Sequence, residues 1–458
     1  MKILGVSEGS HDAAWAVIED GVILEAHHVE RHTRVKNDKW IPGKLLPGYG
    51  LIIGHENKDR VNDRRAAAGQ RYYPPNIVTN FEYNHYETHA WAGWATAPFQ
   101  DCDILCIDAI GENETAAVFE VRNKVFTKTW DMKYPKSIGL AYSAVTHALG
   151  YKPMEEEYIV MGLAAYGEPQ YTLDHLLEIN CHKGLNIASI LRDTAMINGG
   201  AGHKWKPEDV AASVQLLYEN ELLKLVNKYC KHKNIILMGG CALNCVANSK
   251  IKGKNIWIMP NPGDAGSSLG AAARHFGHQL IWKGPYLGTN IENEINPRDV
   301  ARYLFEHSVC GVANGRAEFG PRALGNRSLV ADPRRDVKDT VNEIKRRQKF
   351  RPFAPAILEE YQHEYFEGPM NEYMQFTAKA KHDYKSVTHV DGTARVQVVN
   401  RNCKSVIRPI LEEWYELTGC PMLLNTSLNI KGEPMVDTES DAERWTEQYN
   451  VKVVTKDV

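Results

Sequence analysis

The sequence lacks the features that mark membrane proteins and disulfide-stabilised secreted proteins. No apolar run in its 458 residues approaches the roughly 20 that a membrane span requires. The first residues, MKILGVS, are typical of a strand rather than a signal peptide. The nine cysteines are an odd and scattered set, and the pairs Cys102/Cys106 and Cys241/Cys245 have CxxxC rather than CxxC spacing. We therefore expect reduced core cysteines and a cytoplasmic protein without membrane contact.

An excess of charge of one sign is also missing, as are low-complexity segments. The net charge is −3 and the isoelectric point is about 6.7, which excludes a basic nucleic-acid coat protein. Hydrophobic residues make up 43% and charged residues 24% of the chain, as in ordinary globular proteins. The length suffices for two or three domains with their own cores.

Two segments of the chain repeat one pattern of three strands. The predicted strands cover residues 2–7, 13–19 and 22–30 in the first segment and residues 103–110, 115–121 and 125–130 in the second. Asp20-Gly21 is a strong hairpin signal in the first segment. Because helices follow each set, the pattern predicts an internally duplicated α/β domain of the ribonuclease-H or actin type.

A candidate metal site begins with His85 and His89, which are four residues apart. On a helix both imidazoles would project from one face and suit a single divalent metal; the alternative is an ordinary pair of helix histidines. Asp108 ends an apolar strand and is either a metal ligand or a turn-capping residue. Asp264 opens a helix in a Gly-rich loop, as a fourth ligand or as an N-cap.

Candidate nucleotide-binding residues occur in both halves of the chain. Gly239 and Gly240 follow a predicted strand, where glycines let the backbone approach a nucleotide closely. We place a domain boundary within residues 276–297, after which helices and strands alternate again. The stretch GPRALGNRS (320–328) sets arginines among small residues, as phosphate binding requires. A solvated basic face is the alternative, but apolar neighbours hem in these arginines.

Several motifs together resemble the O-carbamoyltransferases of the nodulation-factor and tobramycin type, over nearly the whole chain. They are His11-Asp12-Ala13, HYETH (85–89), MGLAAYG (161–167), GGCALN (239–244), GDAGSSLGAA (263–272), EFGPRALGNRSLVADPR (318–334), FRPFAPAIL (350–358), HVDGTARVQ (389–397) and LLNTSLN (423–429). The resemblance implies an actin-like, threonylcarbamoyltransferase-type domain at residues 1–280. It also implies a YrdC-like α/β domain at residues 298–458.

The resemblance also implies a two-step reaction. The C-terminal domain would cleave carbamoyl phosphate, join the carbamate to ATP and release pyrophosphate. The N-terminal domain would then transfer the carbamoyl group from carbamoyl-adenylate to a substrate hydroxyl. Iron(II), beside the Mg²⁺ that accompanies ATP, would be held by His85, His89, Asp108 and Asp264.

The same resemblance assigns roles to individual residues. His11 would take the proton of the acceptor hydroxyl, and Lys345 and Arg351 would catalyse adenylate formation. The implied cofactor-binding residues are Gly239, Gly240, Asn244, Arg322, Arg327, Lys345, Arg351, Arg395, Asn425 and Ser427. Two departures from the family pattern are Ile159, where Lys often precedes MGLA, and Leu428 in the NTSLN motif.

Two rival functions stay open at this point. A sugar or carboxylate kinase of the actin-like class would use one ATP site and no carbamoyl phosphate, which leaves residues 298–458 unexplained. A non-catalytic nucleotide- or metal-binding regulator would not need the reactive residues that every motif retains. For an active enzyme, a homodimer is the expected assembly.

The acceptor is the hardest feature to predict. Residues 31–71 hold ten Lys or Arg and four Asp or Glu, a local charge of +6, and Tyr72 and Tyr73 follow them. A basic, aromatic segment suits a polyanion, although a solvated loop is the plain alternative. Because the chain is shorter than the nodulation and antibiotic enzymes, we expect a minimal, virus-like enzyme. We predict a hydroxymethylpyrimidine such as hydroxymethylcytosine, in DNA or a nucleotide, with a sugar, antibiotic or other small-molecule hydroxyl as the alternative.

Overall fold

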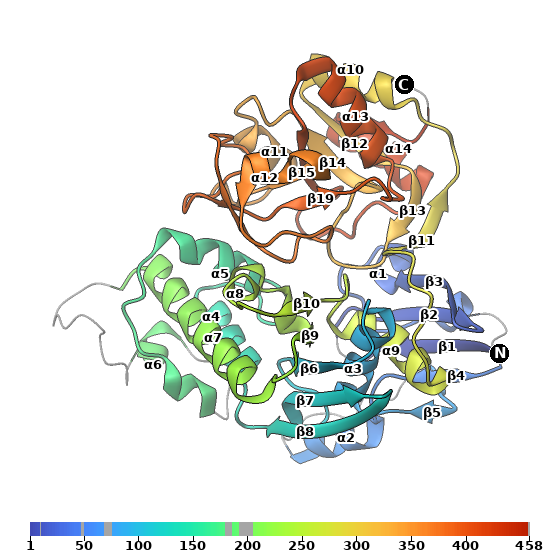
Figure 1. The fold of residues 1–458 in the computed structure, drawn as a ribbon, viewed down its shortest axis with the longest axis vertical. Helices are drawn as coiled ribbons and strands as arrows, with labels where there is room; N and C mark the ends of the chain where they lie inside the picture. The colour runs from blue at the N-terminus through green and yellow to red at the C-terminus, as the bar shows by residue number, and fades with distance from the viewer. Residues whose placement is uncertain (10, 47–49, 68–75, 179–185, 192–204, 457–458) are drawn as a thin grey trace. The chain divides into compact units, whose positions relative to one another are not determined.

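Two five-stranded sheets with the same strand order form the first part of the chain (Figure 1). The computed structural model describes residues 1–456 apart from residues 10, 47–49, 68–75, 179–185 and 192–204. The strands are β1 (Lys2–Ser7), β2 (Ala14–Glu19), β3 (Val22–His28), β4 (Ile52–Gly54), β5 (Phe81–Glu82), β6 (Cys102–Ile107), β7 (Glu114–Arg122), β8 (Val125–Lys133), β9 (Asn234–Met238) and β10 (Asn255–Trp257). The orders are β3-β2-β1-β4-β5 and β8-β7-β6-β9-β10.

The directions of the strands repeat as well as their order. β1 pairs antiparallel with β2 from Lys2–Glu19 to Ser7–Ala14, and parallel with β4. β6 likewise pairs antiparallel with β7 and parallel with β9. The predicted duplicated α/β fold of the ribonuclease-H or actin type is therefore confirmed.

Two helices fill the space between these sheets. α9 (Asp264–Phe276) packs on the first sheet, α3 (His85–Thr96) packs on the second, and the two helices pack on each other. Glycines permit this close contact. A Cβ on Gly5 of β1 would lie 1.9 Å from the carbonyl oxygen of Ser268, and one on Gly270 would lie 1.9 Å from that of Thr88. The sheets and these helices thus hold the ends of α3 and α9 in fixed positions.

The remaining helices of this part follow the sheets in sequence. They are α2 (Lys58–Ala67), α4 (Ile138–Ala148), α5 (Glu157–Leu163), α6 (Ile187–Leu191), α7 (Pro207–Tyr229) and α8 (Cys245–Asn248). α4 and α5 both pack against the long α7. None of the described helices is long and apolar enough to cross a bilayer. The eight cysteines within the described ranges are free, and Cys181 lies outside them.

The chain divides into two units by its internal contacts. Unit 1 contains residues 1–10, 14–23 and 40–282, and unit 2 contains residues 11–13, 24–39 and 283–458. Unit 2 therefore includes the short helix α1 (Val29–Thr33), although this helix lies near the start of the chain. The sequence patterns did not predict this early contribution to the second unit.

Unit 2 is built on a six-stranded mixed sheet in the order β19-β15-β20-β14-β12-β21. The strands of this sheet are β12 (Val309–Ala313), β14 (Arg327–Ala331), β15 (Ala354–Leu358), β19 (Gln397–Val399), β20 (Met422–Ser427) and β21 (Val453–Val454). A second sheet pairs β11 (Tyr286–Ile291) with β13 (Gly315–Glu318). A small third sheet contains β16 (Phe366–Glu367), β17 (Ala378–Ala380) and β18 (Thr393–Ala394). Its helices are α10 (Pro297–His307), α11 (Lys338–Ile344), α12 (Gln362–Tyr365), α13 (Ile407–Thr418) and α14 (Glu439–Tyr449). Separate apolar clusters, one with Trp414 and one with Trp445, form its core.

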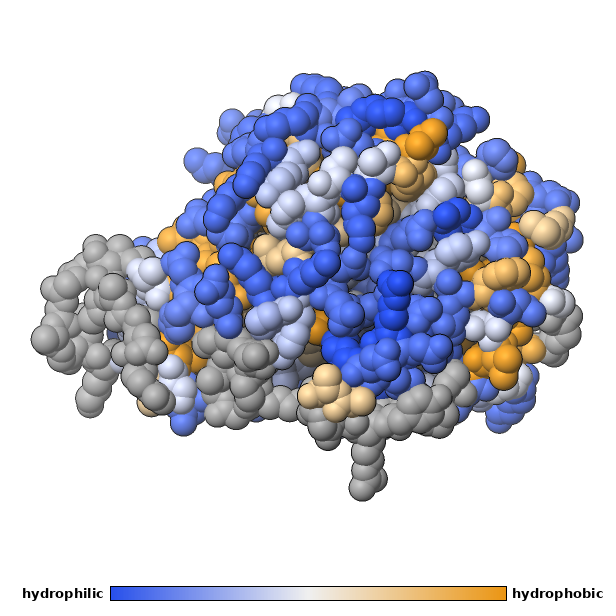
Figure 2. All heavy atoms as spheres, turned by 90° about the horizontal axis from the view of Figure 1, so that it is seen from below, coloured by the Kyte–Doolittle hydropathy of each residue, from blue (hydrophilic) through white to orange (hydrophobic). Residues whose placement is uncertain are grey.

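The face of the molecule in Figure 2 is mostly hydrophilic. Its apolar side chains form small, separate groups, as is normal for protein surfaces.

Candidate functional site

The two histidines of the HYETH motif occupy the first turns of α3. Asn84 caps this helix, because its side chain accepts hydrogen bonds from the backbone N–H of Tyr86 (3.1 Å) and Glu87 (3.2 Å). His85 and His89 lie one turn apart, both are buried, and their Nε2 atoms are 3.2 Å apart. The sequence therefore places two imidazoles side by side on one face of the helix.

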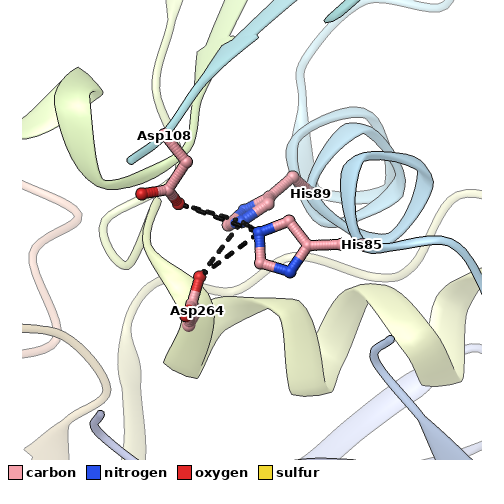
Figure 3. A group of neighbouring side chains, drawn as sticks. All are labelled: His85, His89, Asp108 and Asp264. Carbon is pink, nitrogen blue, oxygen red and sulfur yellow. Dashed lines mark hydrogen bonds and ion pairs between the residues drawn. The ribbon is translucent and has the colours of Figure 1, made fainter. Parts of the chain in front are cut away.

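Two aspartates bring their carboxylates to this pair (Figure 3). Asp108 follows β6, and its Oδ2 lies 3.3 Å from Nε2 of His89 and 4.0 Å from Nε2 of His85. Asp264 is the first residue of α9, and its Oδ1 lies 3.4 Å and 3.6 Å from the same two nitrogens. Gly263 occupies the N-cap position, so Asp264 is not the N-cap that was the alternative. The four side chains come from three separate elements of unit 1.

This cluster has the composition and spacing of a site for a divalent metal. One ligand atom from each of the four residues lies within 4.8 Å of the others. Metal bonds of about 2.1 Å place neighbouring ligand atoms roughly 3.0–3.4 Å apart, close to the separations here. Burial lowers the pKa of His85, but Asp264, Asp108 and Glu56 outweigh burial and raise it well above its ordinary value. The raised pKa reflects a proton on His85 that balances the charge of the carboxylates. A divalent cation bound between the four groups would take the place of that proton.

The backbone around Asp108 fixes the carboxylate that faces the histidines. Its Oδ1 accepts a hydrogen bond from Ala109 N (2.7 Å), and its Oδ2 accepts one from Gly240 N (3.1 Å). Gly239 has a φ of +86°, and a Cβ there would lie 2.1 Å from the carbonyl oxygen of Ile107. The predicted nucleotide-binding glycines therefore lie beside the candidate metal site.

Asn244, another predicted cofactor-binding residue, is engaged within the protein. Its Oδ1 accepts a hydrogen bond from Ala247 N (3.0 Å), and its side chain pairs with that of Gln215. This asparagine thus stabilises the start of α8.

The sequence patterns missed polar residues behind the candidate ligands. His55 and Glu56 directly follow β4 and form, with His85, a second buried group of possible metal-binding atoms. Ser267 Oγ lies 3.0 Å from Nδ1 of His89. The buried Glu112 accepts hydrogen bonds from Asn57 N (2.9 Å) and the Asn84 side chain (3.0 Å). The signal for His55 and Glu56 was a polar pair directly after an apolar strand, and Ser267 lies within the GDAGSSLGAA motif.

His11 lies in the part of the chain that belongs to unit 2. Its Nδ1 is 3.2 Å from Oδ2 of Asp12, and Asp12 has a φ of +59°. Although burial raises the pKa of Asp12, His11 and other nearby cations lower it to about 2. The arrangement pairs a partly exposed imidazole with a charged carboxylate, as in a general base and the group that orients it.

Lys345 and Ser427, both predicted to bind cofactor, are in contact in unit 2. The ammonium group of Lys345 donates to the carbonyl oxygen of Ser427, and it lies 3.3 Å from Ser427 Oγ and 2.8 Å from the Asn429 carbonyl oxygen. Lys345 is 4% exposed. Burial, with Arg347 and Arg351 nearby, lowers the pKa of Lys345 well below its ordinary value. Each of these three acceptors is a neutral carbonyl or hydroxyl oxygen.

The predicted arginine ligands divide into two kinds. Arg322, Arg351 and Arg395 are half-buried. Arg327 is fully buried, and among the described residues its guanidinium donates only to backbone carbonyl oxygens, including those of Asp437 (2.8 Å) and Thr289 (2.9 Å). Its guanidinium therefore holds several loops of unit 2 together. The amide nitrogen of Asn425 donates to Gln397 Oε1 (2.6 Å) and to the Ala323 carbonyl oxygen (3.2 Å).

The basic segment 31–71 divides between the two units. Its residues up to Lys39 belong to unit 2, and the others that are described belong to unit 1. The contacts are Arg31 to the Gly320 carbonyl, Arg34 to those of Pro434 and Met435, Lys36 to Glu30, Lys58 to Glu8, Arg60 to Glu112, Arg64 to the Glu112 carbonyl and Arg65 to the Gly9 carbonyl. Arg71, Tyr72 and Tyr73 lie outside the described residues. Much of the counted charge therefore serves contacts within the protein.

Comparison with known families settles the class of the protein. Residues 44–273 match the family described as "Carbamoyltransferase N-terminus", and residues 301–457 match "Carbamoyltransferase C-terminus". The chain belongs to the carbamoyltransferase family. Its predicted membership is thereby confirmed, and the protein is a carbamoyltransferase enzyme.

Relatives of this carbamoyltransferase resemble it over most of its length. The nodulation protein NolNO of Sinorhizobium fredii is 33% identical, covering 94% of this chain and 76% of the relative. NolO of Bradyrhizobium diazoefficiens is 32% identical over 78% of this chain and 75% of its own. An uncharacterized protein of Synechocystis is 32% identical over 96% and 93%.

Solved structures resemble the carbamoyltransferase only distantly. Component A of the Acidaminococcus fermentans (R)-2-hydroxyglutaryl-CoA dehydratase has a TM-score of 0.37 and 15% identity, covering 60% of this chain and 97% of its own. HypF of T. kodakarensis has a TM-score of 0.35 and 13% identity, covering 60% and 47%. The fold assignment rests on the strand order, not on these likenesses.

Proposed function

We propose that this carbamoyltransferase uses carbamoyl phosphate and ATP to form carbamoyl-adenylate, and then carbamoylates a hydroxyl group. In the first step water hydrolyses carbamoyl phosphate to carbamate and phosphate. The carbamate oxygen attacks the α-phosphorus of ATP, and pyrophosphate leaves. In the second step the acceptor oxygen attacks the carbamoyl carbon, AMP leaves, and an O-carbamate forms.

We assign the first step to the YrdC-like domain proposed at residues 298–458. The observation that carries this assignment is Lys345, a buried lysine beside Ser427 whose ammonium meets no carboxylate among its hydrogen-bond partners. On binding a phosphate, Lys345 would exchange some of these neutral acceptors for charged phosphate oxygens, with little water competing for it. Arg351 and the half-buried Arg322 and Arg395 would add guanidinium donors. Arg327 is proposed to hold the wall of this site rather than the phosphate.

We assign the second step to residues 1–280, with iron(II) bound by His85, His89, Asp108 and Asp264. Bound there, a divalent ion supplies Lewis-acid polarisation of the acyl or phosphoryl oxygen. Gly239 and Gly240 leave room for a nucleotide backbone beside Asp108. His11, oriented by Asp12, would accept the proton of the attacking hydroxyl.

For the acceptor, two candidates stand. The first is a hydroxymethylpyrimidine such as hydroxymethylcytosine, in DNA or a nucleotide. The second is a sugar, antibiotic or other small-molecule hydroxyl. The contacts of Arg60, Arg64 and Arg65 with Glu112 and Gly9 favour the second, because these arginines are partly engaged within the protein.

Isotope-labelled carbamoyl phosphate with ATP provides the deciding experiment. We expect release of phosphate and pyrophosphate and formation of AMP with the wild-type enzyme. Lys345→Ala should abolish pyrophosphate release. His11→Asn should keep pyrophosphate release and lose the carbamoylated product. Pyrophosphate release that does not depend on carbamoyl phosphate would contradict the proposal, as would ADP formation on a sugar, which the rival kinase function requires.

The acceptor is tested in the same mixture. Mass spectrometry of nucleosides from hydroxymethylcytosine-containing DNA, run in parallel with sugar acceptors, should identify the carbamate. If a sugar is consumed and no carbamoylated base appears, the DNA candidate is wrong.

A further inference from the structure

A carboxylate outside the four candidate metal ligands lies directly behind His85. Glu56 follows β4, is 8% exposed, and has its Oε2 3.5 Å from Nδ1 of His85. This nitrogen is the one on the far side of the ring from Nε2, which faces Asp108 and Asp264. Within the described residues, Nδ1 of His85 is buried and has no hydrogen-bond partner, and the Glu56 carboxylate is its ion-pair neighbour. Glu56 is therefore the group available to it.

We propose that Glu56 is a positioning residue that accepts the Nδ1–H of His85 and so directs the lone pair on Nε2 at the metal. The inference rests on the proposed function, since it requires the metal site. A neutral imidazole carries one N–H and one lone pair, and the partner of the N–H decides which nitrogen binds a cation. A carboxylate in this position also makes the imidazole a stronger ligand.

The second histidine has a different outer partner. Nδ1 of His89 lies 3.0 Å from the hydroxyl of Ser267, a fully buried residue of α9. A hydroxyl fixes the ring without adding charge, whereas Glu56 adds a negative charge behind its ring. The two histidines should therefore contribute unequally to metal binding, and loss of Glu56 should weaken binding more than loss of Ser267.

A second metal ion is the competing explanation for the same cluster. Nε2 of His55 lies 3.8 Å from Oε2 of Glu56, and His55, Glu56 and His85 form a group within 4.8 Å. A second ion there would have to bind Nδ1 of His85 while the first ion binds Nε2. The imidazole would then need to lose both protons, which is far less favourable than a hydrogen bond to Glu56. One ion with an outer carboxylate is the arrangement that we infer.

Cobalt(II) titration of the full-length protein under anaerobic conditions tests this inference. The visible absorption of Co²⁺ reports the ligand set, chelator competition gives the Kd, and elemental analysis gives the ions bound per chain. We expect one ion per wild-type chain. Glu56→Ala should weaken binding 10–100-fold, in the range typical of outer-shell partners. Glu56→Gln, whose amide oxygen still accepts the N–H, should weaken it less and shift the absorption. Ser267→Ala should have the smallest effect.

The controls separate this inference from the proposed function and from a loss of folding. His85→Ala should lose the wild-type Co²⁺ spectrum, and a wild-type chain that binds no Co²⁺ would refute the metal part of the proposed function. Wild-type affinity and spectrum in Glu56→Gln and Glu56→Ala would overturn only the role of Glu56. Two ions per wild-type chain, with one lost in Glu56→Gln, would establish the second site instead. Thermal unfolding without metal should show a cooperative transition for Glu56→Gln, and this variant decides the matter if Glu56→Ala does not fold.

Discussion

At the scale of single residues, Asp12 combines an uncommon backbone conformation with a contact to a proposed catalytic group. Its φ of +59° is one that few residues other than glycine, asparagine and aspartate adopt readily. Its carboxylate lies 3.2 Å from His11 and has a pKa of about 2, so it stays charged at neutral pH. A residue kept in such a conformation beside a histidine is well placed to orient that imidazole.

Replacing Asp12 by asparagine tests this orienting role. Asn tolerates the same backbone conformation, so Asp12→Asn should fold normally but remove the charge that favours a protonated His11. We expect carbamate formation to fall, at most by the roughly 100–10,000-fold that a positioned general base contributes, with pyrophosphate release unchanged. Quantifying both products in one reaction mixture checks this. Equal losses of both products would show that Asp12 serves folding or the first step instead.

At the scale of elements, the position of α9 between β1 and α3 determines the metal geometry. Asp264 begins α9, while His85 and His89 lie on α3, so the distance between these helices sets the distance between the ligands. The helices approach closely because Gly270 faces the backbone of Thr88. The candidate site therefore depends on a residue that carries no side chain.

Gly270→Ala should damage both stability and metal binding. The added methyl group would meet the Thr88 carbonyl oxygen at 1.9 Å, and this backbone cannot move without shifting α3. We expect a loss of about 1–3 kcal/mol in the free energy of unfolding, as for other overpacked sites, and weaker Co²⁺ binding in the folded fraction. Urea unfolding and Co²⁺ titration measure the two effects.

Gly43→Ala is the matched control for this substitution. A Cβ at Gly43 meets no atom within 4 Å, and its backbone has no positive φ, so its stability should stay close to that of the wild type. If both alanine variants unfold like the wild type, the close packing of α9 does not limit the site.

Much of this level of structure was predictable from local patterns. Alternating apolar residues and the Asp20-Gly21 turn predicted β1 to β3, and HxxxH spacing predicted two imidazoles on one helix face. Local patterns could not show that Asp264 meets His89 across 175 residues, since that contact depends on how the two sheets are connected. The resemblance to a family, not periodicity, joined these residues in one prediction.

Other features escaped prediction for a physical reason. A count of charges along residues 31–71 does not reveal which groups they pair with, and buried Glu112 and Glu8 neutralise Arg60 and Lys58. Glu56 is likewise an ordinary glutamate in sequence, and only its position behind His85 gives it a role.

At the scale of the whole molecule, the two units do not correspond to two uninterrupted stretches of chain. α1 supplies unit 2 with Arg31, which donates to the Gly320 carbonyl oxygen, and is followed by Arg34, which donates to that of Met435 (2.7 Å). Arg316 in turn donates to the carbonyl oxygen of Leu24 (2.8 Å). Residues 24–39 therefore belong to the folded structure of unit 2.

Residues 283–458 alone should consequently be less stable than the same residues with this segment attached. We expect a lower urea midpoint for the fragment 283–458, and recovery when residues 24–39 are joined to it through a flexible linker. An Arg34→Ala change in the joined segment should remove part of the recovery, because carbonyl oxygens near Met435 lose their donor. Identical midpoints with and without the segment would contradict this expectation.

The early position of α1 has a further consequence for how each new molecule is completed. Arg34 leaves the ribosome 401 residues before the Met435 carbonyl to which it donates. At typical rates of about 5–20 residues per second, α1 waits roughly 20–80 s for that partner. In the nascent protein, the cap of α1 thus reaches this contact only after 401 further residues have been added.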